Sequence, residues 1–439
     1  MRVLVLDGNQ NQAVAAVRSL AAAGHTVLAG DSTSWNKAGW SRCAHQSFQY
    51  PSPQKQAEAF VRHIAAIVAG SMGAGSIVAG STTGAAPPLN PALSNSTQAS
   101  VAQLNSLPDP IPQTLVMPMT EATTLALSLH RDQIFSAGGL MVLPSHEQVL
   151  RAFDKQQTTE LAKSLGIAVP RTTLIENRTD AGRVARSLEY PVVLKPRASE
   201  ELGQQGNVRT GGRPRYASTP VEFDAAYADI SQRASGVLVQ QYVEGEGTGY
   251  FALMHNGELR AEFAHRRIRD VHPTGSGSAV RESRAPEPEI RSASLAILEA
   301  LRWHGVAMVE FRWQPGHAPV FMEVNGRFWN SLPLACYAGV DFPALLAQMA
   351  ERGDVPPQHG YRNGVRCRWF LGDFRHLIEV WKGRPQGYPG VYPGRFATLA
   401  SVLTPVPGTF HDLFRWNDPL PEAGDWLNFA RRIVQRGKQ

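Results

Sequence analysis

Short apolar runs and amphipathic stretches alternate from the first residues of the chain. Residues 3–6 form an apolar run, and residues 12–23 carry apolar side chains at helical spacing before Gly24 closes the segment. A second apolar run follows at residues 26–29. A strand, a helix and a strand in this order predict a βαβ unit of an open parallel sheet.

The same criteria predict further elements along most of the chain. Ser145 and Asp154 are capping residues, and each is followed by a stretch with helical periodicity. Helices are predicted at residues 121–131, 145–153, 154–166 and 287–302. Strands are predicted at residues 115–118, 191–196, 237–243, 248–254, 258–266, 305–313 and 319–324. The alternation of both kinds of element predicts an α/β fold.

Three segments depart from this alternation. Residues 70–113 are rich in Gly, Ser, Ala, Pro and Asn and nearly free of charge, which is typical of a flexible insertion. Residues 200–213 are rich in Gly, Gln and Arg and are predicted to form a mobile loop. Residues 349–439 contain more Trp, Tyr, Pro and Gly, and we interpret them as an extension with helical pieces.

The composition narrows the class of protein. With 439 residues, the chain is long enough for roughly two to four domains. No run approaches the roughly 20 apolar residues of a membrane helix, and the N-terminal run is too short for a signal peptide. We therefore expect a cytoplasmic protein with no membrane partner. The three cysteines lie far apart without CxxC spacing, which indicates neither a zinc site nor a disulfide framework.

The charge distribution argues against one class of partner. The net charge of +6 is modest, and the basic residues are spread along the chain rather than gathered in a tail. We therefore expect no nucleic-acid partner. Only seven of the 43 basic residues are lysines. Since lysine is a compact point charge that suits one phosphate oxygen, a lysine at a chemically meaningful position is informative here.

Familiar phosphate-binding and hydrolase motifs are absent from the sequence. It contains no GxxxxGK[ST] loop, no HExxH and no GxSxG. The first strand–turn–helix unit lacks GxGxxG, so a structural Rossmann-like domain is favoured over a dinucleotide-binding oxidoreductase. Any nucleotide must therefore be held in another way.

Two predicted strands carry polar side chains in an apolar setting. Glu323 and Asn325 are two residues apart, so they point to the same face, and Arg327 follows if the extended geometry persists. A hairpin between the two strands would bring Glu310 opposite Glu323. Two carboxylates and an amide oxygen suit Mg²⁺, and an adjacent arginine suits a γ-phosphate.

A solvated strand face is the competing interpretation of this pattern. It accounts for the polar residues but less well for the apolar residues that flank them, which indicate a mostly buried sheet. Two lysines favour a functional interpretation, although each alone also suits an ordinary solvated lysine. Lys155 begins a capped helix, and Lys195 ends a short apolar strand.

Taken in chain order, these features resemble the ATP-grasp superfamily, and within it the branch of predicted ATP-dependent carboligases or carboxylate–amine ligases. The resemblance covers roughly residues 1–345. The matching motifs are Phe153-Asp154-Lys155, residues 190–196, residues 240–247, residues 265–269 with Arg281-Glu282-Ser283, and residues 323–327. The hinge glutamate of many relatives is replaced here by Gln240-Gln241, and the flap at residues 199–206 is irregular and acidic.

The resemblance implies a division into domains. Residues 1–145 would form a Rossmann-like pre-ATP-grasp domain that includes the insertion at residues 70–113. The remaining parts would be the small lobe with linker helices (146–236), the large lobe with the metal site (237–348) and a C-terminal extension (349–439).

The resemblance also implies cofactors and the residues that bind them. Lys155 and Lys195 would contact the phosphates of ATP, and Glu246 would bind the ribose hydroxyls. The adenine hinge, acting largely through backbone groups, would consist of Gln241, Tyr242 and Val243. The ligands of two magnesium ions, with Mn²⁺ as an alternative metal, would be Glu310, Glu323 and Asn325.

Catalysis would depend on Arg327 and Lys195, which would stabilise the transferring phosphoryl group, and on Arg281, which follows a small-residue loop at residues 275–278. Arg281 and the basic residues at 265–269 would capture a substrate carboxylate and phosphate oxygens; an exposed basic strand edge is the equal alternative.

The reaction implied by this resemblance is ligation. A carboxylate would be activated as an acyl-phosphate and joined to an amine, both of them small molecules, and the enzyme could form a homodimer. Two alternatives remain: a carboxylase-type enzyme that activates bicarbonate, although the sequence contains no visible biotin-carrier segment, and a non-catalytic nucleotide-binding regulatory protein.

Overall fold

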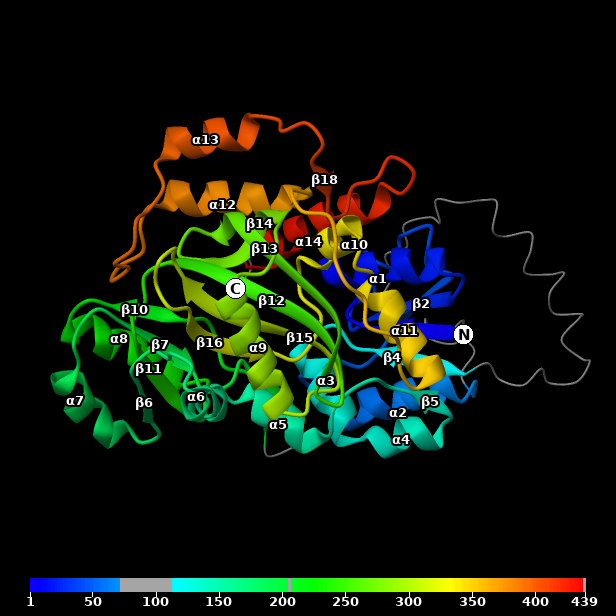
Figure 1. The fold of residues 1–439 in the computed structure, drawn as a ribbon, viewed down its shortest axis with the longest axis horizontal. Coiled ribbons are helices and arrows are strands. Elements are labelled where there is room, and N and C mark those ends of the chain that lie inside the picture. The colour runs from blue at the N-terminus through cyan, green and yellow to red at the C-terminus, as the bar shows by residue number, and fades with distance from the viewer. Residues whose placement is uncertain (72–112, 204–206, 437–439) are drawn as a thin grey trace, which may run out of the picture.

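The computed structural model describes residues 1–71, 113–203 and 207–436, so nearly all of the insertion predicted at residues 70–113 lies outside the described residues. These residues form three larger sheets and one two-stranded sheet, with helices packed on their faces (Figure 1). The architecture confirms the prediction of an α/β fold.

The N-terminal sheet is parallel and has the strand order β3-β2-β1-β4-β5. Its strands are β1 (Arg2–Val5), β2 (Thr26–Asp31), β3 (Gln46–Gln49), β4 (Thr114–Met117) and β5 (Gly139–Leu140). Its helices are α1 (Asn11–Ala22), α2 (Ala57–Val68), α3 (Glu121–Leu129) and α4 (Arg131–Ser136). The apolar stripe of α1 is buried in the core, and β1, α1 and β2 form the predicted βαβ unit.

Two capped helices, α5 (His146–Phe153) and α6 (Lys155–Ser164), lead into an antiparallel sheet of order β10-β7-β11-β6. The side chain of Ser145 accepts from the backbone N–H of Gln148, and Asp154 accepts from those of Gln156 and Gln157, which confirms both predicted caps. The strands are β6 (Thr172–Ile175), β7 (Val192–Pro196), β10 (Arg215–Ala217) and β11 (Val237–Gln241). Two helices pack on this sheet, α7 (Arg178–Ser187) and α8 (Pro220–Ser231).

The segment predicted to be a mobile loop contains two paired strands. β8 (Glu200–Leu202) and β9 (Val208–Thr210) are antiparallel, with Glu201 opposite Arg209. Leu202 and Val208 anchor the pair against a hydrophobic core cluster. The prediction of a mobile loop is therefore wrong for these strands, because the packing of Leu202 and Val208 against the core fixes them. Residues 204–206 lie outside the described residues.

The largest sheet has the order β16-β15-β12-β13-β14-β17-β18 and is antiparallel except at β17 and β18. Its strands are β12 (Glu246–His255), β13 (Glu258–His272), β14 (Ser276–Ser283), β15 (Gly305–Trp313), β16 (Val320–Asn325), β17 (Arg366–Arg368) and β18 (Phe410–His411). Helix α9 (Pro288–Ala300) connects β14 to β15. β14 corrects the prediction of a loop at residues 275–278, since the strand already begins at Ser276.

The C-terminal residues contribute the edge strands of this sheet and five helices. These are α10 (Leu332–Ala338), α11 (Phe342–Arg352), α12 (Phe370–Lys382), α13 (Arg395–Leu403) and α14 (Leu420–Arg436). Buried ion pairs join Arg18 to Asp418 at 2.8 Å and Lys37 to Asp425 at 2.7 Å. Helix α14 and the segment before it are thereby held against α1 and the segment between β2 and β3 (Figure 1).

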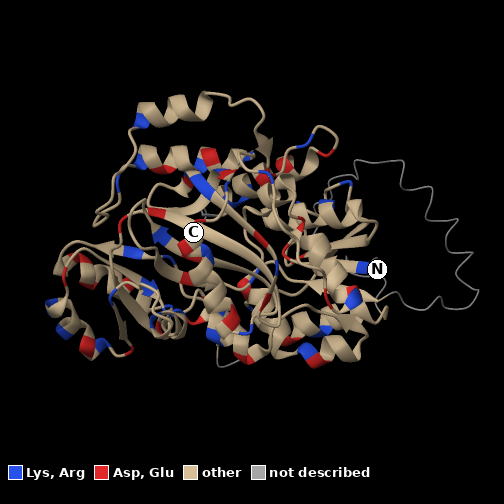
Figure 2. Ribbon diagram, viewed as in Figure 1, with Lys and Arg blue, Asp and Glu red and all other residues tan. Residues whose placement is uncertain are grey.

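Lys and Arg residues are interspersed with Asp and Glu along most elements (Figure 2). The excess positive charge is therefore spread over the fold, as the sequence indicates. In the part of the chain that the structure describes, no single helix is long and apolar enough to cross a membrane, while the bent pair α10 and α11, at 85°, meets the length and composition criteria together.

Candidate functional site

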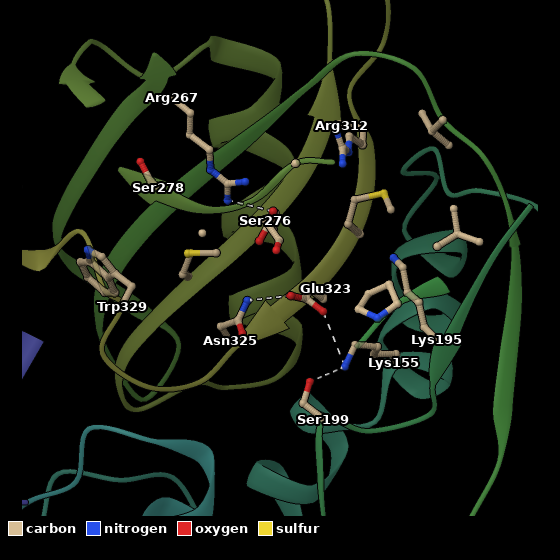
Figure 3. A pocket seen from close by; sticks show the side chains of 18 of the residues that line it. Lys155, Lys195, Ser199, Arg267, Ser276, Ser278, Arg312, Glu323, Asn325 and Trp329 are labelled. Atoms are coloured by element: carbon tan, nitrogen blue, oxygen red, sulfur yellow. Dashed lines mark hydrogen bonds and ion pairs between the residues drawn. The ribbon is translucent and has the colours of Figure 1, made fainter. Parts of the chain in front are cut away.

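A cavity of about 360 Å³ lies between the four-stranded and the seven-stranded sheets (Figure 3). β7 and β11 line one side, β13 to β16 line the other, and α6 contributes its first residue. Nine of the predicted site residues line this cavity: Lys155, Lys195, Gln241, Tyr242, Val243, Glu310, Glu323, Asn325 and Arg327.

Glu323 lies where the two lysines converge. The Nζ atom of Lys155 is 3.6 Å from Oε2 of Glu323 and donates to Oγ of Ser199 at 2.8 Å. Asn325 donates from Nδ2 to Oε1 of Glu323 at 3.2 Å. Burial alone would raise the pKa of Glu323, but Lys155 and Lys195 hold it below its usual value. The carboxylate is therefore ionised at neutral pH.

Lys195 points into the same cavity from β7 (Figure 3). Burial lowers its pKa to about 8; Glu323 opposes this shift, and the charge of Lys155 adds to it. Among the described residues, the Lys195 ammonium makes no hydrogen bond and no direct ion pair. Because a half-buried ammonium without a hydrogen-bond acceptor is destabilising, this group is well placed to receive an anionic ligand.

Glu310 faces Glu323 across the antiparallel pair of β15 and β16, in the register that the predicted hairpin requires. Nη2 of Arg267 donates to Oε1 of Glu310 at 2.9 Å, while its Nη1 lies 3.8 Å from Asp270. The charge of Glu310 is therefore balanced by Arg267 of β13. The charge of Glu323 is balanced by Lys155 of α6 and Lys195 of β7.

Arg327 lies in the loop after β16 rather than on the strand itself. Its Nη2 atom donates to Oδ1 of Asn325 at 2.9 Å and lies 3.5 Å from Oε1 of Glu121. Since Asn325 also donates to Glu323, its amide connects the carboxylate to the guanidinium group. The three polar residues at the end of β16 thus form one hydrogen-bonded row.

The donor set fits a magnesium ion. Glu310 and Glu323 face each other, Glu323 is ionised, and Asn325 adds an amide oxygen. Mg²⁺ prefers such oxygen ligands and keeps further positions for water and phosphate. Within the described ranges, no group of three or more His, Cys, Asp or Glu side chains could hold a metal, so the structure offers this mixed set rather than a closed protein cage.

The predicted adenine hinge lies at the end of β11. The backbone N–H of Gln241 donates to O of Arg171 at 2.9 Å, and that of Tyr242 donates to O of Pro191 at 3.1 Å. The N–H of Val243 has no hydrogen-bond partner among the described residues. Val243 therefore supplies the available backbone donor of this segment.

Two predicted site residues lie outside the cavity. Glu246 is exposed at the start of β12, where it pairs in register with Trp313. Arg281 is fully buried on β14, forms an ion pair with buried Asp412 and donates to O of Ser278 at 2.8 Å. We correct the interpretation of Arg281 to a structural role. The sequence does not reveal its partner, which lies 131 residues further along the chain.

The basic segment of β13 has separate partners rather than one ligand-facing edge. Arg267 enters the cavity, whereas Arg266 pairs with Glu282 at 2.8 Å. Arg269 forms an ion pair with Asp373 of α12. Only part of this segment is therefore available to a ligand in the cavity.

Sequence reasoning overlooks two further residues of the cavity. Arg312 lies two residues after Glu310 on β15, lines the cavity and donates to O of Gly245 at 2.9 Å. The alternation rule, applied to β15 as it was to β16, could have identified it. Ser199, the hydrogen-bond partner of Lys155, carries no such signal because it lies in an irregular segment.

The known proteins that are similar to this chain include ATP-grasp proteins, although no family model matches it. The D-alanine–D-alanine ligase of Nitrosospira multiformis is 26% identical over 216 residues, covering 45% of this chain and 66% of the relative. The arginine-specific carbamoyl phosphate synthase large chain of Bacillus subtilis is 23% identical over 240 residues, covering 52% of this chain and 22% of the relative. The chain thus spans less than two thirds of these relatives.

Solved structures show the same fold over most of the chain. A biotin carboxylase from Campylobacter jejuni superposes with a TM-score of 0.57 at 15% identity, covering 83% of this chain and 74% of the neighbour. N5-carboxyaminoimidazole ribonucleotide synthetase from Thermus thermophilus superposes with a TM-score of 0.53 at 14% identity, covering 83% of this chain and 82% of that structure. L-amino acid ligase from Bacillus licheniformis superposes with a TM-score of 0.52 at 14% identity, covering 80% of this chain and 73% of that structure. The predicted ATP-grasp resemblance is confirmed.

Proposed function

We propose that this chain, an ATP-grasp protein by its motifs and its fold, is an ATP-dependent ligase that activates a carboxylate as an acyl-phosphate and couples it to an amine. Lys155 and Lys195 surround Glu323, and this arrangement carries the proposal. It combines cations for a polyphosphate with oxygen ligands for magnesium in one cavity. Sequence similarity to D-alanine–D-alanine ligases supports C–N bond formation.

Each part of the cavity has a role in this proposal. Lys155 and Lys195 bind the phosphates of ATP, and Val243 with its two preceding residues binds adenine through the backbone. Glu310, Glu323 and Asn325, which line the cavity, would hold two magnesium ions that offset the charge of the phosphates. Arg312 and Arg267 add positive charge on the opposite sheet.

ATP enters the reaction as a substrate that supplies the activating phosphoryl group. An oxygen of the carboxylate substrate forms a bond to the γ-phosphorus, and ADP leaves. Arg327, held by Asn325, lies where a guanidinium can stabilise the charge of the transferring group. The amine nitrogen then attacks the acyl carbon, phosphate leaves with the former carboxylate oxygen, and one proton is released. These steps require positioning and charge but no nucleophilic side chain.

We assign the domains as the resemblance implies. The parallel sheet supports a Rossmann-like pre-ATP-grasp domain at residues 1–145, and the two antiparallel regions support a small lobe at 146–236 and a large lobe at 237–348. Residues 349–439 are assigned as a C-terminal extension whose strands β17 and β18 join the sheet of the large lobe.

The proposal is tested by incubating the full chain with Mg-ATP and pooled amino acids and small carboxylates while phosphate release is measured. Substrate-dependent release that disappears in Glu323→Ala is the expected result, and subdivision of the pool then identifies the substrates. If no pool releases phosphate, thermal-shift measurements with Mg-ATP decide between the remaining outcomes. Absence of nucleotide binding would contradict the proposal entirely.

The same assay separates the two alternatives. Release that requires bicarbonate alone indicates carboxylase-type activation; the likeness to a biotin carboxylase, at 15% identity, concerns the fold and does not favour that reaction. Binding of Mg-ATP without turnover indicates a regulatory protein. The ionised Glu323 between two lysines argues for retained phosphoryl-transfer chemistry.

A further inference from the structure

A second cavity, of about 390 Å³, lies where the N-terminal sheet meets the C-terminal helices. Its lining comes from the segment after β1, from α12 and α14, from the last residue of β13, and from the segment before β10. Asn330 lines both this cavity and the proposed nucleotide cavity. The two cavities therefore adjoin, although the second contains neither Lys155 nor Lys195.

Positive charge exceeds negative charge in the second cavity. Lys37 is neutralised by Asp425 at 2.7 Å, and Lys382 by Glu379 at 2.8 Å. Three further cations line it, namely Arg213, Arg375 and Arg432. None of these three forms an ion pair within the described ranges of the chain. Three guanidinium groups therefore face the cavity without a direct ion-pair partner; Asp425 and Glu379, which lie near Arg375, pair with the two lysines instead.

These guanidinium groups are close enough to influence one another. Burial lowers the pKa of Arg375, and the charges of Arg213 and Arg432 lower it further. Arg375 is held by neutral groups: its guanidinium carbon lies 5.8 Å from the ring centroid of Trp369, and its Nη2 lies 3.5 Å from Nε2 of His272. Burial, Arg213 and Arg375 lower the pKa of His272 to about 4, so this imidazole is neutral at pH 7. The packing orients Arg375 without cancelling its charge.

The cavity also lies at the carboxyl edge of the parallel sheet, where open α/β sheets commonly bind ligands. Asn9 follows β1 and accepts a hydrogen bond from Nδ2 of Asn428 at 2.7 Å. This contact holds α14 at the sheet edge, and Arg432 lies one helical turn after Asn428, on the same face. A charge from the end of the chain is thereby positioned beside the first βα turn.

We propose that the second cavity binds a multiply charged oxyanion, either a phosphate monoester or a ligand with several carboxylates. Unpaired guanidinium groups supply the charge and the planar donors that such oxyanions require. Because Asn330 lies in both linings, a ligand held here by its anionic end presents its other end to the nucleotide cavity. This assigns it as an anionic substrate of the ligase, and that assignment rests on the proposed function.

The test is isothermal titration calorimetry on the full chain in the absence of nucleotide. Glycerol 3-phosphate, citrate and uncharged glycerol are titrated in separate experiments. Arg375→Gln and Arg432→Gln each remove a charge from the cavity. Arg431→Gln is the matched control on the same helix, because Arg431 instead lies over the ring of Trp35 at 4.8 Å. We expect at least one anion to bind, with a Kd at least tenfold higher in either cavity variant and unchanged in the control.

Arg213→Gln, on an exposed segment, keeps the test decisive if a helix variant fails to fold. Binding of glycerol 3-phosphate alone identifies a phosphate ligand, and binding of citrate alone identifies a polycarboxylate. The proposal is overturned if neither anion binds, or if the folded cavity variants bind as the wild type does. Since this assay needs no ATP, it stands if the ligase proposal fails; anion-dependent phosphate release from Mg-ATP would identify the ligand as a substrate.

Discussion

Glu310 and Glu323 lie directly opposite each other across β15 and β16, yet each carboxylate has its own cation. Arg267 donates to Glu310 at 2.9 Å, and Lys155 lies 3.6 Å from Glu323. Two neighbouring carboxylates without such partners would share a proton, because like charges raise the pKa of one member. Arg267 and Lys155 thus offset the repulsion between the two carboxylates, as the proposed magnesium site requires.

Glu323→Gln keeps the shape of this side chain and removes its charge. We expect substrate-dependent phosphate release to fall by about a hundredfold or more, the effect typical of losing one group that stabilises charge in a transition state. The measurement is kcat/KM for ATP, with folding checked by circular dichroism. Glu299→Gln, on the exposed end of α9, is the control. Full turnover in Glu323→Gln would refute the metal-ligand role.

Lys195→Met tests the phosphate contact separately from turnover. A hydrogen bond from an ammonium to a phosphate contributes about 1.5–3 kcal/mol, so the Kd for Mg-ATP should rise about tenfold to a hundredfold. Lys163→Met changes an exposed lysine of α6 and should leave the affinity unchanged. Equal affinity of both variants in a calorimetric titration would place Lys195 outside the phosphate site.

Tyr388 tests whether the C-terminal region supports the hinge. The centroid of its ring lies 6.3 Å from that of Tyr242, with an interplanar angle of 90°. The centroid of the Tyr216 ring is 4.9 Å away, with an interplanar angle of 78°. Aromatic pairs contribute about 0.5–1.5 kcal/mol beyond burial, so Tyr388→Ala should weaken nucleotide binding about twofold to tenfold. Tyr388→Phe keeps the ring and should bind nearly as the wild type does. A uniform loss in both variants would indicate that the hydroxyl, not the ring packing, is responsible.

The sequence predicted those parts of the site that depend on local rules. The i, i+2 relationship placed Glu323 and Asn325 on one face, and the hairpin placed Glu310 opposite Glu323. Capping by Asp154 likewise located the start of α6, and hence Lys155. Each of these relationships involves neighbours in the chain or adjacent strands.

Relationships over long sequence separations could not be predicted in this way. Asp412 pairs with Arg281 only because β18 runs parallel to β17 at the far edge of the sheet. Glu246 is placed on the exposed start of β12 by pairing with β15, which motif alignment does not specify. The second cavity likewise forms only when α14 returns to the first βα turn.

Arg281→Met tests whether Arg281 has a structural role, through its ion pair with Asp412, rather than a catalytic one. Removal of one partner leaves the Asp412 carboxylate buried and unpaired, and breaking such a pair is destabilising by about 3–5 kcal/mol. We expect that loss in the free energy of unfolding measured with urea, while turnover per folded molecule stays near the wild-type value. Unchanged stability with lost turnover would instead restore Arg281 to the catalytic site.

Glu422 makes the stability of the fold depend on pH. It is mostly buried at the start of α14 and accepts a hydrogen bond from Nε1 of Trp426 at 2.7 Å. Burial raises its pKa from 4.5 to about 7. The folded chain therefore retains a proton that the unfolded chain releases above about pH 4.5. The contribution of Glu422 to stability is complete below that pH and is lost as the pH rises through about 7.

Between about pH 5 and pH 8, Glu422 should therefore lower the free energy of unfolding by up to about 3 kcal/mol. Glu422→Gln keeps an oxygen acceptor for Trp426 but cannot ionise, so it should remove this decline and be the more stable form at pH 8. Urea unfolding of both proteins across this range measures the effect, with the exposed Glu147→Gln as the control. Parallel pH profiles for Glu422→Gln and the wild type would show that Glu422 ionises alike in the folded and unfolded chains, which its burial beside Trp426 argues against.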